Sequence, residues 1–249
     1  MLGQHTNYKL IVAYDGTRFF GWQKNNAGPS IEDALEKALR ITLQQDVILQ
    51  AASRTDRGVH AAGQVVNFFT EQPIDCFKLQ YRLNQLLDDD IAILSLEQAP
   101  HDFHPTLHAK GKEYHYNIAT GPILLPHLRL THWHVPQIDS AQARQAALEC
   151  VGLKDFKAFC NFRKTLNYES TIRTITRFDI IETAEGWRCE IEGDHFLYKM
   201  ARNLVGTAIY AAIGKMNSMQ VAQLFLEKQR TLAGITAPAH GLVLYKVLY

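Results

Sequence analysis

The stretch from Ser53 to His60, Ser-Arg-Thr-Asp-Arg-Gly-Val-His, contains the residues best suited to carry chemistry. Its single carboxylate, Asp56, lies between Arg54 and Arg57, whose positive charges favour the ionised acid. A carboxylate that stays ionised and is held in place can act as a nucleophile or a base. Asp and Gly are also common in ordinary surface turns, so the stretch alone leaves a plain turn open as an alternative.

The neighbours of Asp56 indicate how this loop would be held and what it would bind. Apolar runs at 47–49 and 65–69 predict buried strands on both sides, and strands are a rigid frame for a catalytic group. The two arginines could contact the phosphates on either side of a target nucleotide. Gly58 would let a backbone or a base approach closely.

A second cationic element is predicted at residues 197–213, a long helix that ends before Gly214. His195, Lys199, Arg202 and Gly206 recur at helical spacing and predict one polar stripe, with the apolar face opposite. An arginine on such a helix commonly extends to solvent. The alternative is that Arg202 pairs with a buried carboxylate, for which Asp56 is the candidate.

Tyr114 is the third candidate, on a strand predicted at 112–119 by alternation of its side chains. A tyrosine on a central strand can stack on a base. Tyrosines of this kind are also often simply packed within a sheet, and the sequence leaves both possibilities open.

Metal and cofactor sites are not predicted. Seven of the eleven histidines fall between residues 101 and 134, but Pro105 separates His104 from His108, and no carboxylate is placed to complete a site with His132 and His134. Motifs that bind nucleotide cofactors are missing, and the four cysteines are too widely spaced for a zinc site or a disulfide framework. We therefore expect chemistry from side chains alone.

Composition predicts a soluble protein. No apolar run approaches a membrane span, the first residues do not resemble a signal peptide, and unpaired cysteines suit the cytoplasm. The formal net charge of +1 conceals an uneven distribution. Residues 61–100 carry two Lys/Arg and six Asp/Glu, whereas residues 101–177 carry ten Lys/Arg and six Asp/Glu. The basic segment could follow an RNA backbone, or it could be ordinary solvated surface.

The order of predicted elements indicates an α+β fold. The first hundred residues predict strand, helix, strand, strand, helix, strand, which is typical of a ferredoxin-like or split-βαβ unit. After a proline-containing linker at 99–108 the pattern partly repeats. We expect an N-terminal half at 1–104 with the Asp56 loop and a C-terminal half at 105–249 with the tyrosine strand and the arginine helix.

Five segments in this order resemble the TruA family of tRNA pseudouridine synthases, over residues 8 to 245. They are Tyr14-Asp15-Gly16-Thr17 with Gly21-Trp22-Gln23, then Arg54-Thr55-Asp56-x-Gly58-Val59-His60, Lys112-Glu113-Tyr114-His115-Tyr116, Phe196-Leu197-x-x-Met200-x-Arg202-Asn203-x-Val205-Gly206, and Pro238-Ala239-x-Gly241-Leu242. A single match would be weak, but five collinear matches are specific.

The resemblance implies isomerisation of uridine to pseudouridine at positions 38–40 of the tRNA anticodon arm, without metal or cofactor. Asp56 would be the nucleophile, held by Arg202, while Tyr114 stacks on the everted uracil. Arg54 would fill the vacated space or bind a phosphate. The implied fold is two RRM-like halves that share a central mixed, mainly antiparallel sheet with a cleft between them, and the implied assembly is a homodimer.

Arg57, His60 and Lys199 are further predicted RNA contacts. Two other functions remain open from the sequence. Split-βαβ units with sheet aromatics also occur in RNA-binding proteins without catalytic activity. A carboxylate enzyme acting on a free nucleoside is the second alternative, although such glycosidases usually need two flanking carboxylates.

Overall fold

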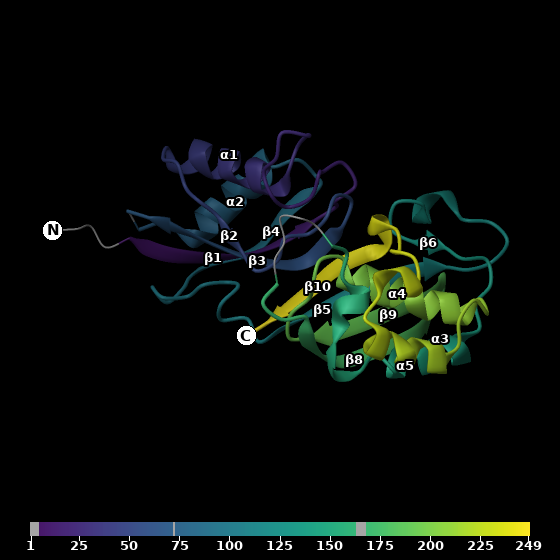
Figure 1. Cartoon of the computed structure of the whole chain (residues 1–249). Helices are drawn as coiled ribbons and strands as arrows, with labels where there is room; N and C mark the ends of the chain where they lie inside the picture. The colour runs from purple at the N-terminus through teal and green to yellow at the C-terminus, as the bar shows by residue number, and fades with distance from the viewer. Residues whose placement is uncertain (1–4, 72, 163–167) are drawn as a thin grey trace. The chain divides into compact units, whose positions relative to one another are not determined.

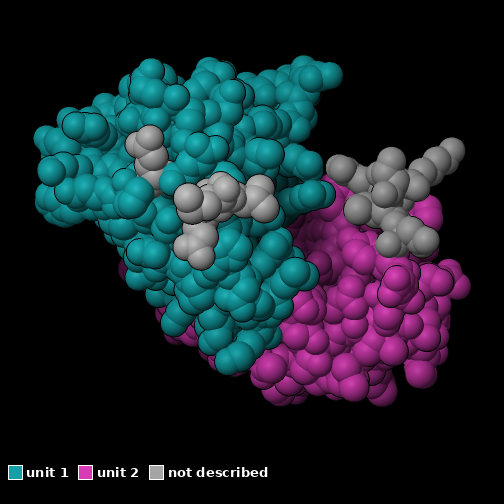
Figure 2. All heavy atoms as spheres, turned by 90° about the vertical axis from the view of Figure 1, so that its left-hand side faces the viewer, with its two compact units in different colours: residues 1–110, 244–249 teal, residues 111–243 magenta. Residues whose placement is uncertain are grey.

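The computed structural model describes residues 5–71, 73–162 and 168–249. The chain forms two compact units, the first made of residues 1–110 and 244–249 and the second of residues 111–243 (Figure 2). The helices and strands of the first unit are, in order, β1 (Thr6–Tyr14), α1 (Ile31–Leu43), β2 (Gln50–Ala51), β3 (His60–Thr70), α2 (Cys76–Leu86) and β4 (Ile91–Gln98). Those of the second are β5 (Gly111–Ala119), β6 (Trp133–His134), α3 (Ser140–Leu148), β7 (Gly152–Asp155), β8 (Ile172–Thr183), β9 (Gly186–Gly193), α4 (Met200–Ala212) and α5 (Ser218–Glu227). The last strand, β10 (Leu242–Leu248), begins in the second unit and ends in the first.

The first unit is built on β1, which pairs antiparallel with β3 on one edge and β4 on the other. Alternate residues of β1, such as Leu10 and Val12, are buried, while α1 and α2 lie together on one side of these strands (Figure 1). Ser30 caps α1 by accepting a hydrogen bond from the Asp33 amide. The helices thus bury the apolar face of the sheet that supports the Asp56 loop.

The second unit contains an antiparallel sheet in the order β5-β9-β8-β7, with the short β6 parallel to β5. One face of this sheet is apolar, because Tyr116 of β5, Cys189 of β9 and Ile180 of β8 follow one another across the ladder and are buried. Helix α3 packs on α4 and against β8. The opposite face is polar. The predicted α+β class, with mainly antiparallel pairing, is confirmed.

Two predicted elements differ from the structure, and one observed strand was not predicted. The strand predicted at the apolar run 47–49 does not pair there, and β2 covers only Gln50–Ala51, because the Leu49 amide donates to the Glu36 carboxylate instead of to a strand. The strand β7 was not predicted. Helix α4 begins at Met200 rather than Leu197. Among the described residues, no helix has the length and hydropathy needed to cross a bilayer.

Candidate active site

The loop that carries Asp56 is held to β3 on the side that leads into it. The Ala52 amide donates to the Val65 carbonyl at 2.8 Å, which extends the ladder beyond β2. Gln64, fully buried on β3, then accepts from the Ser53 amide at 3.2 Å and donates to the Ser53 carbonyl at 2.6 Å. The Gln64 side chain thus forms the two hydrogen bonds that a neighbouring strand would otherwise form with Ser53. The main chain is therefore fixed at the point where the ladder between β2 and β3 ends.

The same loop is held from a second direction by the segment that follows β1. The Tyr14 hydroxyl and the Thr55 hydroxyl lie 2.8 Å apart in a buried position, and the Trp22 amide donates to the Thr55 carbonyl at 3.1 Å. Immediately after Thr55, the Val59 amide donates to the Asp56 carbonyl and closes a turn. Gly58 in this turn has φ +76°, a conformation that L side chains rarely adopt. The Asp56 main chain is therefore fixed on both sides.

Arg54 and Arg57 are both exposed, whereas Asp56 between them is partly buried. The Arg57 guanidinium carbon lies 3.9 Å from the centroid of the Phe20 ring, a cation–π contact that orients its side chain. Exposed guanidinium groups beside a fixed carboxylate are suited to bind anionic ligands at the edge of the loop. Their roles as phosphate contacts stay predictions.

His60 lies beneath this loop rather than at its surface. Its side chain is 8% exposed, and its Nδ1 accepts from the Gly16 amide at 3.2 Å and lies 3.1 Å from Asp15 Oδ1. Burial raises the pKa of Asp15, but hydrogen bonds from Thr17 and the nearby His60 outweigh it, and the pKa is lowered overall. This geometry joins the loop to the segment after β1, and the predicted RNA contact of His60 stays untested.

Tyr114 lies in the second unit, buried on β5 opposite Ile191 of β9. Its ring meets the Phe196 ring edge to face, with centroids 4.8 Å apart and planes at 73°. This contact fixes the tyrosine ring by packing, which is what a stacking surface for a base requires. The stacking role itself stays a prediction.

Arg202 is fixed to the chain segment before β10. Its Nε donates to the Ala237 carbonyl at 2.7 Å, and the Ala237 amide donates to the Arg202 carbonyl at 3.2 Å. One turn further along α4, a Cβ added to Gly206 would overlap the Ile235 carbonyl, so only glycine allows the segment to lie this close. The half-buried guanidinium is therefore oriented by its Nε atom.

A buried polar network holds the same segment against α4. Arg230 donates to the side chains of Asn203, Thr236 and Asn161 at 2.8, 3.0 and 3.1 Å, and to the Gly234 carbonyl at 2.8 Å. Asn203 is fully buried and donates in turn to Asn161 and to the Phe159 carbonyl. Residue 203 follows Arg202 directly, so this network fixes the helix turn from which Arg202 projects.

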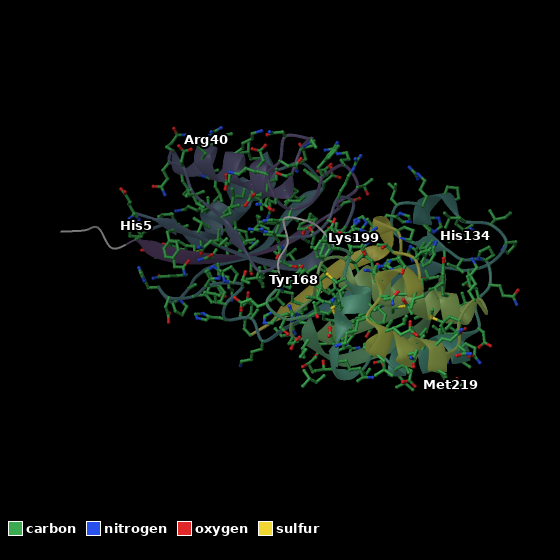
Figure 3. The ribbon with its side chains drawn as sticks, viewed as in Figure 1. His5, Arg40, His134, Tyr168, Lys199 and Met219 are labelled. Atoms are coloured by element: carbon green, nitrogen blue, oxygen red, sulfur yellow. The ribbon has the colours of Figure 1, made fainter. Side chains whose placement is uncertain are left out.

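Lys199 does not belong to a helical stripe, because α4 begins one residue later. Lys199, labelled in Figure 3, has φ +60°, a left-handed conformation that is uncommon for a residue with a side chain. The Tyr198 amide donates to the Tyr168 hydroxyl, and the Tyr198 carbonyl accepts from the Asn161 amide. These two long-range bonds keep the segment before Met200 out of the helix. The predicted polar stripe from His195 to Gly206 was therefore wrong.

Three groups on the polar face of the second sheet, Glu113, His115 and Glu190, lie close enough to hold a metal ion. Arg177 bonds to Glu113 at 2.7 Å and to Glu190 at 2.6 Å, and His115 lies 2.8 Å from Glu113. Burial raises the pKa of Glu190, but the bonding arginines outweigh it and lower the pKa overall. The carboxylates are already neutralised, which is the arrangement of an ion-pair network.

Three of the histidines between residues 101 and 134 form hydrogen bonds with nearby main-chain groups. The His104 Nδ1 accepts from the amides of Thr106 and Leu107, and the His108 Nδ1 accepts from the His104 amide. The His134 ring bonds to the Gly121 carbonyl at 2.8 Å. These hydrogen bonds give three of the seven histidines between residues 101 and 134 a local structural role.

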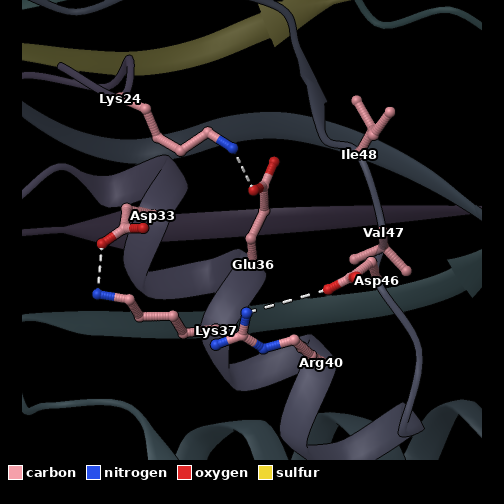
Figure 4. A pocket seen from close by; sticks show the side chains of 8 residues that line it. All are labelled: Lys24, Asp33, Glu36, Lys37, Arg40, Asp46, Val47 and Ile48. Carbon is pink, nitrogen blue, oxygen red and sulfur yellow. Dashed lines mark hydrogen bonds and ion pairs between the residues drawn. The ribbon is translucent and has the colours of Figure 1, made fainter.

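A pocket of the first unit, about 360 Å³ in volume, lies beside α1 and the segment before β2 (Figure 4). Its charges are paired: Lys24 with Glu36 at 2.5 Å, Lys37 with Asp33 at 2.7 Å, and Arg40 with Asp46 at 4.0 Å. Since these side chains satisfy one another, the pocket provides no reactive group.

The structure thus brings Asp56, Arg54, Arg57 and His60 together in the first unit and places Tyr114 and Arg202 in the second. The pairing of Asp56 with Arg202 stays a prediction. Asn203 and Arg230 were missed in the sequence because a buried polar network depends on distant residues. Lys112 was also missed, although an alternating strand with a lysine on its apolar face was a visible signal.

A family model described as tRNA pseudouridine synthase matches residues 10–106 and 146–249. The chain belongs to this family. It is 47% identical over 246 residues to tRNA pseudouridine synthase A 2 of Protochlamydia amoebophila (strain UWE25), which covers 98% of this chain and 94% of that protein. It is 39% identical over 244 residues to tRNA pseudouridine synthase A of Acetivibrio thermocellus, covering 98% and 99%.

Proposed function

We propose that this protein is an isomerase that converts uridine to pseudouridine at positions 38–40 of the tRNA anticodon arm. The observation that carries the proposal is the Asp56 loop, fixed by β3 and by Tyr14 and Trp22 and flanked by exposed arginines. The relatives named tRNA pseudouridine synthase A support tRNA as the substrate. The protein would work in the cytoplasm as a homodimer.

In this proposal Asp56 acts as the nucleophile, on the ribose C1′, the uracil ring or the 2′ position. The N1–C1′ bond breaks, the uracil turns, and a C5–C1′ bond forms. A proton leaves C5 and a proton is gained at N1, so the reaction is an isomerisation without net oxidation or reduction. Arg202 would hold the Asp56 carboxylate, and Tyr114 would stack on the uracil.

Binding requires the target nucleotide to leave its stack, which costs a few kcal/mol. Phosphate contacts from Arg54 and Arg57, whose side chains are exposed, would recover part of this cost. Such contacts release counterions, so affinity for tRNA should fall steeply with added salt.

The test is to incubate tRNA transcripts with the protein and map pseudouridine by mass spectrometry or carbodiimide modification. We expect modification at positions 38–40, loss of each signal when that uridine is replaced by cytidine, and no turnover of free uridine. Modification only elsewhere would overturn the positional assignment. Tight tRNA binding with no modification of any transcript would favour an RNA-binding protein without activity.

A further inference from the structure

Lys112, the second residue of β5, is a buried lysine with only 8% of its surface exposed. Successive side chains of a strand alternate between faces, so Lys112 and Tyr114 share the apolar face of the sheet. Lysine is almost never buried to this extent unless its ammonium group is paired. The position therefore needs an explanation that packing does not provide.

Charged groups near Lys112 in the sheet are engaged elsewhere. Glu113 and Glu190 lie on the opposite face and bond to Arg177. Asp194 accepts hydrogen bonds from two main-chain amides. Within the part of the chain that the structure describes, no group forms a hydrogen bond or ion pair with the Lys112 side chain. Burial lowers the pKa of Lys112 to about 8, so the amine is mostly protonated at neutral pH.

The surroundings of Lys112 connect it to Tyr114. Its partner in the ladder is Gly193 of β9, which presents no side chain to the shared face. The Phe196 ring lies over this glycine, 3.4 Å from where a Cβ would be, and the same ring meets Tyr114 edge to face. The Phe196 ring thus contacts Tyr114 and lies over the ladder partner of Lys112, and the two residues are separated along β5 by about 6–7 Å.

We propose that Lys112 binds a backbone phosphate of the RNA strand that contains the target uridine. The inference rests on the proposed function, because it needs an RNA whose base contacts Tyr114. A nucleotide with its base at Tyr114 has its sugar and phosphate within reach of a lysine side chain two residues away. The compact ammonium group suits a phosphate oxygen, and the unpaired charge is held ready for it.

If Lys112 is kept for a phosphate contact, its buried charge should lower the stability of the free protein by a measurable amount. A buried charge without a partner destabilises the free protein, whereas methionine has a similar length and no charge. Lys112→Met should therefore raise the melting temperature of the free protein by roughly 5 °C while it weakens RNA binding. A lysine with a purely structural role would show the opposite change, because its substitution would lower stability.

The experiment compares wild type, Lys112→Met and Lys215→Met as full-length proteins with one tRNA transcript. Lys215 is an exposed lysine of the same unit after α4, and its substitution removes the same charge. Affinity is measured from low to high salt, together with pseudouridine formation and thermal unfolding. For Lys112→Met we expect about 10- to 100-fold weaker binding at low salt, and a log–log salt slope shallower by about 0.7–0.9. Lys215→Met should match wild type.

Equal affinities and slopes for Lys112→Met and wild type would overturn the phosphate contact. A lower melting temperature, or a loss of turnover with unchanged binding, would also overturn it, because either would indicate a structural or a purely catalytic lysine. The proposed function fails separately, if wild type binds tRNA and forms no pseudouridine. Binding and its salt slope still decide the role of Lys112 in that case.

Discussion

The Asp56 loop and the turn of α4 around Arg202 are fixed in different ways. The loop is held mainly through main-chain groups, with the Gln64 side chain bonded to the Ser53 main chain and the Tyr14 hydroxyl bonded to the Thr55 hydroxyl. The α4 turn is held through buried side chains that meet at Arg230. A loop held by its main chain can carry varied exposed side chains, whereas a helix held by a buried network depends on every member. Of the three predictions that follow, the first and the last test this contrast and the second tests the buried charge of Lys112.

Arg230→Met should have the largest effect on stability. It removes the donor to the Gly234 carbonyl and one of the two donors to each of the Asn203 and Asn161 side-chain oxygens, and we expect a loss of about 2–4 kcal/mol in the free energy of unfolding. Turnover should fall as well, because the turn that carries Arg202 loses its anchor. Urea denaturation and pseudouridine formation measure the two effects.

The matched control is Arg129→Met, which removes one exposed bond to the Pro126 carbonyl and should change stability by less than about 0.5 kcal/mol. If Arg230→Met is as mild as this control, the buried network does not hold α4, and the contrast with the Asp56 loop disappears.

The buried charge of Lys112 predicts a pH dependence of stability. Its pKa is about 8 in the folded protein and close to 10.4 when unfolded, so the unfolded chain binds more protons between these values. Wild-type stability should therefore rise, relative to Lys112→Met, as pH increases from 8 to 10.4. Below pH 8 the substituted protein should be more stable by up to about 3 kcal/mol. Unfolding of both proteins from pH 7 to 10.5 measures this difference, and a constant difference over that range would contradict a buried, titrating Lys112.

Tyr14→Phe should have the smallest effect on stability and a selective effect on turnover. It removes the hydroxyl that contacts Thr55, next to Asp56, at a cost of about 1 kcal/mol. Tyr8→Phe is the control, since this residue of the same strand loses a comparable bond to the Ile74 amide, away from the loop. We expect about 10-fold lower kcat for Tyr14→Phe alone. Similar kcat values for both would show that the Thr55 contact does not position Asp56.

Local signals predicted much of the fold. The tyrosine strand at 112–119, the helix that carries Arg202 and the class of the fold follow from alternation and helical spacing, which act over a few residues. The missed features depend on distant partners. Val47 and Leu49 are buried, but the segment forms no ladder there, and the start of α4 is set by a hydroxyl thirty residues earlier.

The candidate site also contains residues that local signals predicted and residues that depend on distant partners. Asp56 and its arginines could be selected from residue types and spacing, because the chemistry of a carboxylate between cations is local. Arg202 was placed on the right helix but with a wrong polar stripe, since Lys199 lies outside α4. Arg230 could not be selected, because its partners are separated from it by 27 and 69 residues. The domain boundary at residue 104 stays a prediction.

The most direct test of the central claim is Asp56→Asn, assayed for pseudouridine in tRNA and, in parallel, for tRNA affinity. The substitution keeps the shape of the side chain and removes the nucleophilic charge. We expect no detectable pseudouridine, with affinity equal to that of wild type or higher, because a negative charge near the RNA is lost. Pseudouridine formation by Asp56→Asn at a rate near that of wild type would contradict the account.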